Sequence, residues 1–339
     1  MRVIKTEDAI GMVLGHDVTE IVPGKFKGAA FRKGHIIQEE DIERLLRIGK
    51  EHIYILEVDE NHLHEDDAIK LLGDLFCGNG IYYTEPVEGK INIKAKHKGL
   101  LKINREVLDT LNNLGDISIA TIHENRYVNE DDLVAGSKVI PLIIEKQKID
   151  TAAEILKDKG SIFNIKPFKK YETAIIVTGS EVYKGRIKDK AKAIIERKLE
   201  FFGSEVCYST IVPDDLGMIK EEIIKSKEMR AELIIVTGGM SVDPDDQTPK
   251  AIRDVGTDII TYGTPVLPGA MLLFGYLDNI PVFGLPANII FNPITAFDLI
   301  IPRVLAGEKI EKKDITKSGY GGLCLNCEVC TFPNCHFGK

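Results

Sequence analysis

The chain has 339 residues, of which 44% are hydrophobic and 28% charged, and its formal net charge is -8. This length exceeds one ordinary domain, and the composition is that of a globular protein. The acidic balance argues against general binding to nucleic acid or to an anionic membrane, because both require a cationic surface. The first residues, MRVIKTEDAIG, lack the apolar run of a secretion signal, so we expect a cytoplasmic protein.

Residues 1–166 predict an α+β region of one or two small lobes. Within residues 39–56, Ile42, Leu45 and Leu46 recur at helical spacing, and a strand follows the helix-ending Gly49. Residues 104–122 repeat this plan of helix, glycine and strand. The N-terminal region is therefore expected to mix short helices with short strands.

Residues 171–306 predict a regular α/β domain. Three apolar strands, TAIIVTG, EVCYSTIV and ELIIVTGG, alternate with two amphipathic helices. The first helix is expected to bury Ile187, Ala191, Ile194, Ile195, Leu199 and Phe202 and to end at Gly203. Such alternation predicts a three-layer, doubly wound and mostly parallel sheet. The uncharged segment 279–297 holds three prolines and three asparagines, which favours buried core over a membrane span.

The strand ends of this domain carry the polar groups. They read VTGSE (177–181), TIVPDD (210–215) and VTGGMS (236–241). Parallel sheets bind ligands beyond the carboxyl ends of their strands, so we expect the three ends to meet. A glycine pair before a helix, Gly238-Gly239, can direct backbone N–H groups at a phosphate, and nearby hydroxyls add donors.

Carboxylates lie among these anion-binding groups. Glu181, Asp214, Asp245 and Asp246 could face a phosphate through Mg²⁺, or could accept hydrogen bonds from a polar ring. Helix capping is the plainer alternative. Asp214 or Asp215 would then cap the second helix, and Asp245 or Asp246 would cap the helix that Pro249 begins.

Residues 171–306 resemble the molybdopterin-binding domain shared by molybdopterin adenylyltransferase and molybdopterin molybdotransferase. The matching motifs are VTGSEVYKGRIKD, VPDDLGMIKEEI, TGGMSVDPDDQTPKAI, LPGAMLLFG and VFGLPANIIFNP. The resemblance implies a pterin pocket and a Mg²⁺ ion held by Asp246, Asp214 and Glu181. It implies that the pocket is lined by Thr178, Gly179, Ser180, Gly238, Gly239, Ser241, Thr248, Pro268, Gly269, Pro286 and Asn288.

The N-terminal segment FRKGHIIQEEDIERLLRIGKEHIYIL is similar to the molybdotransferase branch of this family. The resemblance thus implies a Mg²⁺-dependent enzyme of molybdenum cofactor biosynthesis that acts on molybdopterin or its adenylate with molybdate. A homodimer and contact with a molybdoenzyme or another assembly protein would follow. A non-catalytic carrier or sensor is the alternative, because GKFKGAAFRKG replaces the branch's S-x-M-D-G-Y-A signature. A nucleotide-processing enzyme, as in the related competence-damage proteins, is a third reading.

The tail, residues 307–339, holds four cysteines in the spacing C-x2-C-x2-C-x4-C: Cys324, Cys327, Cys330 and Cys335. Clustered thiols in a reducing compartment favour a metal, and the spacing is close to a ferredoxin run, so an iron–sulfur cluster or zinc is expected. An empty, reduced and flexible tail is the alternative. Glycines 319, 321 and 322 would tether the tail as a module.

Overall fold

The computed structural model describes residues 2–22, 26–56, 60–241, 243 and 246–339. The chain forms two compact units. The first unit comprises Met1–His97, Lys102–Ile122 and Asn129–Ile165, and the second comprises Lys98–Leu101, His123–Val128 and Lys166–Lys339.

The first unit begins with a small mixed region. Strand β1 (Arg2–Lys5) pairs antiparallel with β4 (His52–Ile55), and β2 (Val18–Val22) pairs with β3 (Phe26–Phe31). Helix α1 (Glu39–Arg47) buries Leu45 completely, and Gly49 follows it with a φ of 82° before β4. A one-turn helix, η1 (Thr6–Asp8), completes this region. The expected helix, glycine and strand are confirmed here.

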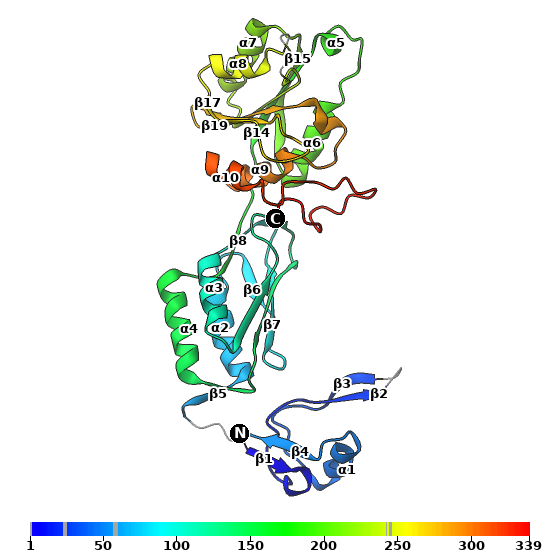
Figure 1. Ribbon diagram of the computed structural model, residues 1–339, viewed down its shortest axis with the longest axis vertical. Coiled ribbons are helices and arrows are strands. Elements are labelled where there is room, and N and C mark those ends of the chain that lie inside the picture. The colour runs from blue at the N-terminus through cyan, green and yellow to red at the C-terminus, as the bar shows by residue number, and fades with distance from the viewer. Residues whose placement is uncertain (1, 23–25, 57–59, 242, 244–245) are drawn as a thin grey trace. The chain divides into compact units, whose positions relative to one another are not determined.

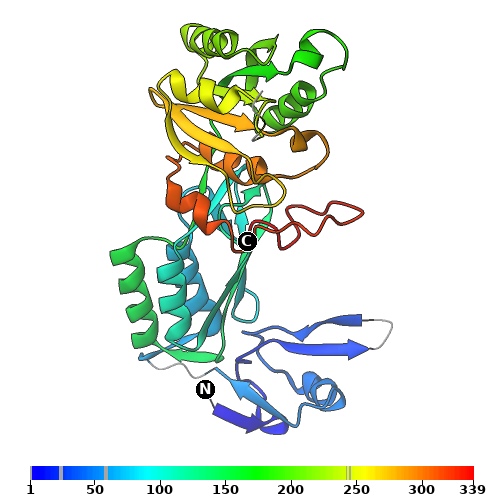
Figure 2. The same cartoon turned by 45° about the horizontal axis from the view of Figure 1, so that its top comes forward.

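The rest of the first unit is built on a four-stranded antiparallel sheet with the order β6-β7-β11-β9. Helices α2, α3 and α4 lie side by side along it in Figures 1 and 2. The sheet strands are β6 (Ile81–Tyr83), β7 (Lys90–Ala95), β9 (Ile117–Thr121) and β11 (Leu133–Val139), and the helices are α2 (Glu65–Phe76), α3 (Arg105–Asn113) and α4 (Lys146–Lys159). A smaller sheet of this unit joins β5 (His62–His64) to β12 (Ile143–Glu145). The chain also contains a three-stranded sheet of the order β10-β8-β13, made of β8 (Gly99–Ile103), β10 (Tyr127–Val128) and β13 (Phe163–Lys166).

The second unit is built on a six-stranded sheet with the order β15-β14-β16-β19-β18-β17. The first four strands run parallel, β18 runs opposite to them, and β17 is antiparallel to β18 and so runs in the direction of the first four. Its strands are β14 (Glu172–Thr178), β15 (Glu205–Val212), β16 (Leu233–Thr237), β17 (Asp258–Tyr262), β18 (Leu273–Leu277) and β19 (Ile280–Leu285). The expected doubly wound, mostly parallel sheet is confirmed.

Helices cover both faces of this sheet, as Figure 1 shows. One face packs against α6 (Ala191–Phe202) and α9 (Ala296–Leu305), and the other against α7 (Leu216–Glu228) and α8 (Thr248–Asp254). Alternate residues of each strand point to opposite faces, so Ile175 and Ile176 enter different cores. The remaining short elements are α5 (Ser180–Tyr183), η2 (Ala287–Ile290) and α10 (Lys312–Lys317).

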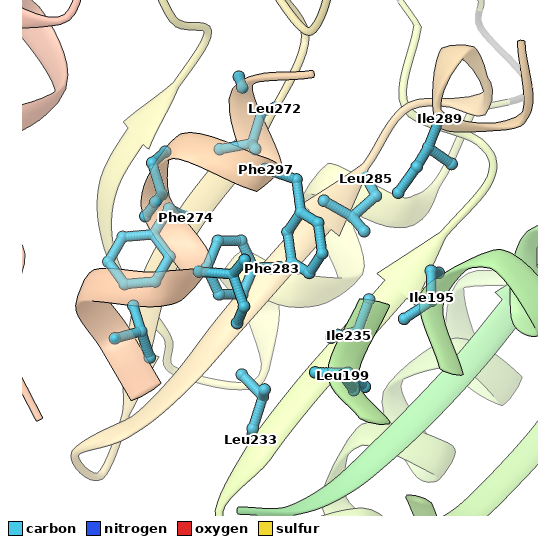
Figure 3. Packing of buried hydrophobic residues seen from close by; sticks show 14 of the residues in the cluster. Ile195, Leu199, Leu233, Ile235, Leu272, Phe274, Phe283, Leu285, Ile289 and Phe297 are labelled. Carbon is cyan, nitrogen blue, oxygen red and sulfur yellow. The ribbon is translucent and has the colours of Figure 1, made fainter. Parts of the chain in front are cut away.

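Aromatic rings fill the larger core of the second unit. Phe274, Phe283 and Phe297 lie together between the sheet and α9, with ring centroids 4.7 and 5.1 Å from that of Phe283 (Figure 3). The segment 279–297 supplies β19, η2 and the start of α9; β19 is largely buried as expected, whereas Phe291 after η2 is 81% exposed. Within the described ranges, no helix has the length and apolarity to cross a membrane.

The predicted start of the first helix of this domain is wrong. Ile187 was expected on the buried face, but its side chain is 57% exposed and α6 begins only at Ala191. The chain turns instead at Gly185, with a φ of 68°. The carboxylate of Asp189 then accepts hydrogen bonds from the N–H groups of Ala191 and Lys192, and so fixes the beginning of α6.

Candidate functional site

The carboxyl ends of β14, β15 and β16 lie at the point where successive strands are added to the other side of β14. From β14 the chain passes to β15 on one side, and β16 lies on the other side of β14. The loops after β14 and β16 therefore leave a crevice at the carboxyl edge, which is where doubly wound sheets bind ligands. Thr178 ends β14, Thr237 ends β16, and both side chains are buried. The expected convergence is confirmed.

Gly238 and Gly239 form a turn that only glycine fits. Their φ angles are 102° and 55°, and a Cβ atom on Gly238 would lie 2.2 Å from the carbonyl oxygen of Thr178. A Cβ on Gly239 would lie 3.0 Å from Oγ1 of Thr248 and 3.2 Å from Oδ1 of Asp214. The side chains of Thr178 and Thr248 also share a hydrogen bond of 3.1 Å. Three segments far apart in sequence thus close on this turn.

Asp214 joins the ends of β14 and β15. Its Oδ2 accepts a hydrogen bond of 2.8 Å from the N–H of Ser180, and the hydroxyl of Ser180 accepts one of 3.3 Å from the N–H of Asp214. Asp215 performs the capping, since its Oδ1 accepts from the N–H of Met218 in the first turn of α7. The alternative left open in the sequence is thereby resolved, and Asp214 faces the crevice side.

Asp246 belongs to the loop rather than to the helix that follows. Its Oδ2 accepts a hydrogen bond of 2.7 Å from the N–H of Ser241. The N-cap of α8 is Gln247, which makes no capping hydrogen bond through its side chain. Pro249 lies in the first turn, as expected. Asp245, the other candidate of this pair, lies outside the described residues.

Tyr262 is a site residue that the strand-end motifs do not predict. Its hydroxyl donates to the carbonyl oxygens of Met240, at 3.1 Å, and Ser241, at 3.4 Å. Burial raises the pKa of this phenol, and the charge of Asp246 raises it further. Tyr262 ends β17, which pairs with the antiparallel β18 but runs in the same direction as β14 and β16, so its carboxyl end lies at the same edge of the sheet.

Asn288 carries an unsatisfied acceptor. Its Oδ1 is buried and has no hydrogen-bond partner among the described residues. It lies in η2, two residues after Pro286 and directly beyond β19. A buried acceptor without a donor costs free energy, so this atom suits a ligand that brings an N–H group.

Pro268 and Gly269 pack against the beginning of α9. Gly269 has a φ of 118°, and a Cβ there would lie 2.6 Å from the backbone nitrogen of Ala296. That N–H donates to the carbonyl oxygen of Pro268 at 3.0 Å. The loop leads into β18, whose first residue pairs with β19 near the carboxyl edge. No hydrogen bond between described residues links it to the Gly238–Gly239 turn.

Glu181 is the least engaged of the predicted acids. It is exposed in the single turn of α5, next to Gly179, and its carboxylate makes no hydrogen bond or ion pair with the described residues. In the described part of the chain, no three His, Cys, Asp or Glu side chains are grouped so that they could hold a metal ion. The three predicted acids therefore do not form a ready metal site by themselves.

The cysteine tail packs on the α/β unit. Leu323 forms a parallel bridge with Leu267, and the N–H of Gly338 donates to the carbonyl oxygen of Gly321 at 3.0 Å. Phe337 is buried in the larger core, because its ring fills space beside α9. The tail is thus a closed loop after α10, visible in red in Figure 2, rather than a free tether.

The four cysteines of this loop differ in exposure. Cys324 and Cys335 contact the core, whereas Cys327 and Cys330 are exposed. The nearby His336 is occupied, since its Nε2 lies 2.8 Å from the carbonyl oxygen of Leu323. The two isolated cysteines, Cys77 and Cys207, have pKa values raised by burial, although the side chain of Cys207 is partly exposed.

The second unit contains a segment that is similar to a known protein family. A family described as probable molybdopterin binding domain matches residues 174–306. The glycine turn, Asp214, Asp246 and Asn288 all lie within the matched residues. A second family, described as a domain of unknown function, matches residues 3–57.

Individual relatives match different shares of the chain. A molybdopterin molybdenumtransferase of Haemophilus influenzae is 24% identical over 266 residues, which are 74% of this chain and 65% of that protein. A competence-damage inducible protein of a Geobacillus species is 36% identical over 87 residues, 25% of this chain and 21% of that protein. A solved molybdopterin biosynthesis protein of Pyrococcus horikosii is 15% identical, with a TM-score of 0.36, over 72% of this chain and 79% of its own. The chain spans 65% or less of the length of these two curated relatives.

Proposed function

We propose that the protein binds molybdopterin or its adenylate at the carboxyl edge of the six-stranded sheet and acts in molybdenum cofactor biosynthesis as a molybdotransferase-like enzyme. The observation that carries the proposal is the Gly238–Gly239 turn, on which Thr178, Thr248 and Asp214 converge. Backbone N–H groups and hydroxyls at this turn suit a phosphate. The family of residues 174–306 and the name of the Haemophilus influenzae relative support the same ligand.

The rest of the edge suits the pterin ring. A pterin presents several N–H groups, and the carboxylate of Asp246 and the orphaned Oδ1 of Asn288 are acceptors. Molybdate would be the co-substrate. In this arrangement the glycine turn holds the phosphate, while the acceptors orient the ring. A molybdoenzyme or another assembly protein would receive the product.

Magnesium fits the site only together with its ligand. Mg²⁺ usually takes one or two carboxylates and completes its shell with water and phosphate oxygens. Asp214 and Asp246 each use Oδ2 in a hydrogen bond to a backbone N–H, which leaves Oδ1 of each for such a role. When bound there, Mg²⁺ would neutralise charge on the phosphate linkage. The chain itself would position the linkage through the N–H of Gly239, because the N–H of Gly238 already donates to the carbonyl oxygen of Leu285 at 3.3 Å.

A turnover assay tests the enzymatic proposal. Purified protein is mixed with adenylated molybdopterin, molybdate and Mg²⁺, and release of AMP is measured. Asp246→Asn should lower the rate at least tenfold, since it removes the charge that faces the ligand. Asp243→Asn is the matched control, because Asp243 is exposed in the same loop and should leave the rate unchanged. No AMP release by the wild-type protein would refute the transferase activity.

A non-catalytic carrier or sensor is the second candidate. It is favoured by the segment GKFKGAAFRKG, which lacks the aspartate of the molybdotransferase signature, and by Ala270 after Pro268–Gly269. Tight pterin binding without turnover would select this function. Preference for a nicotinamide nucleotide over molybdopterin would instead select the nucleotide-processing function, which the Geobacillus relative favours.

We further propose that the cysteine loop binds an iron–sulfur cluster or zinc after a local rearrangement. Its ends are fixed by Leu323 and Gly338, whereas Cys327 and Cys330 lie on an exposed stretch between them. Movement of this stretch could bring the outer thiols to Cys324 and Cys335. Metal analysis and UV-visible spectra of anaerobically purified protein should show bound metal, and Cys327→Ser with Cys330→Ser should remove it. Metal-free wild-type protein would contradict the proposal.

A further inference from the structure

A pocket of about 490 Å³ lies in the second unit, with a lining that includes Ile289, one residue after Asn288 of the carboxyl-edge site. Helix α6 forms one side, and the segment from Ile289 to Ile294 forms another. None of the predicted pterin-site residues lines it. Its volume falls in the range of small-molecule sites, about 300–1,000 Å³, and is suited to one or two fused rings.

Aromatic side chains from three separate segments wall this pocket. Tyr127, Phe201 and Phe202 are in edge contact, with ring centroids 5.1 and 5.8 Å from that of Tyr127. Phe332, from the cysteine loop, closes the same wall at 6.3 Å from Tyr127. Phe201 is 45% exposed although it is held between these rings. Such walls favour a flat aromatic ligand, which can stack on one ring or meet the edge of another.

The charges of the pocket favour an anion. Lys198 is neutralised, because its Nζ contacts the carboxylate of Asp298 and the carbonyl oxygen of Pro293. Arg197 also lines the pocket, is exposed, and has no hydrogen-bond or ion-pair partner among the residues that the structure describes. A cation would compete with Lys98, whose Nζ already lies 3.7 Å from the centroid of Phe201.

We infer that this pocket is a second small-molecule site, which takes a planar aromatic or heteroaromatic molecule bearing one anionic group. The ring lies between Phe201, Phe202 and Phe332, and the anion pairs with the guanidinium of Arg197. Arginine suits this role because it offers several donors to a carboxylate, sulfonate or phosphate. The inference does not depend on the proposed function, since it uses no residue of the pterin site.

Two matched naphthalene probes test the inference on the full-length protein. Naphthalene-1-sulfonate carries the anion, and 1-naphthylmethylammonium carries a cation on the same ring. The chain contains no tryptophan, so the fluorescence of the naphthalene ring can be followed during titration with little background. We expect the sulfonate to bind at least ten times more tightly than the ammonium probe. Equal affinities, or no binding of the sulfonate, would overturn the inference.

Two arginine variants locate the bound anion. Arg197→Gln should weaken binding of the sulfonate about tenfold, because it removes the charge of one hydrogen-bonded pair. Arg230→Gln changes the net charge equally on an exposed residue after α7, and should leave the affinity unchanged. Both replaced side chains are exposed, so both variants should fold. If Arg197→Gln binds the sulfonate as tightly as the wild-type protein does, the pocket is not the site.

Discussion

At the scale of single residues, the glycine turn has the clearest physical constraint. Gly238 combines a φ of 102° with a space in which a Cβ would lie 2.2 Å from the Thr178 carbonyl oxygen. Gly238→Ala should therefore lower the free energy of unfolding by about 3 kcal/mol, from left-handed strain and overpacking together. It should also weaken pterin binding. Chemical denaturation and ligand titration measure the two effects.

The control for this variant is Gly203→Ala. Gly203 has a φ of 86° at the end of α6, but no atom lies within 4 Å of the position of its Cβ. Gly203→Ala should lower the free energy of unfolding by about 1 kcal/mol, from backbone strain alone, and should leave the affinity for the pterin unchanged. Equal effects of the two variants would mean that the close approach of Thr178 to Gly238 is unimportant.

The raised pKa of Glu65 predicts that the free energy of unfolding depends on pH. Burial raises its pKa from 4.5 to about 7, with nearby Asp66 and Glu88 adding to the shift and Lys138 opposing it. The folded state therefore holds the Glu65 proton more tightly than the unfolded state does. The stability that this proton contributes to the folded state is complete below pH 4.5 and is lost as the pH rises through about 7. As the pH rises from 4.5 to about 7, the free energy of unfolding of Glu65→Gln should increase by about 3 kcal/mol relative to that of the wild-type protein. Chemical denaturation at several pH values measures the difference in free energy of unfolding. Glu154→Gln is the control, because Glu154 is exposed. If the free energies of unfolding of the wild-type protein and Glu65→Gln change in parallel with pH, the prediction is contradicted.

Residue identity alone predicted which strand ends carry polar groups, but not the contacts of each acid. Asp214 and Asp215 are neighbours with the same side chain, and either could cap α7. Only the direction of the chain after Pro213 decides that Asp215 caps the helix while Asp214 accepts from Ser180. Likewise the orphaned acceptor of Asn288 depends on burial, which the sequence does not give.

At the scale of elements, hydrophobic spacing predicted the sheet and its helices where apolar residues recur over several turns. The spacing was misleading at Ile187, because one isoleucine four residues before Ala191 matches a helix that the turn at Gly185 prevents. The packing of the tail against the second unit could not be predicted from its glycine content. Its glycines allow close packing against Pro265 and Lys339 rather than free movement.

The tail should contribute to stability through Phe337. This ring is 2% exposed within the larger core of the second unit, so Phe337→Ala should lower the free energy of unfolding by about 3 kcal/mol. Tyr320→Ala, in the same tail but 91% exposed, should change it by less than about 0.5 kcal/mol. Denaturant titration of both variants makes the comparison. A neutral Phe337→Ala would mean that the tail does not pack in solution.

At the scale of the whole molecule, the sequence predicted a ligand site in the second unit and no function for the first unit. The strand ends of a parallel sheet must share one edge, so order along the chain was enough to bring Thr178, Asp214 and Gly238 together. The first unit mixes short antiparallel strands and helices, whose pairing depends on contacts distant in sequence. Its residues 3–57 match a family of unknown function.

The central claim, that the carboxyl edge of the six-stranded sheet binds molybdopterin, is tested most directly by equilibrium titration. Molybdopterin is titrated anaerobically into the wild-type protein, Asp246→Asn and Asp243→Asn. We predict saturable one-site binding to the wild-type protein and to Asp243→Asn, and affinity at least tenfold weaker for Asp246→Asn. Absence of binding to the wild-type protein, or equal affinity for all three proteins, would contradict the account.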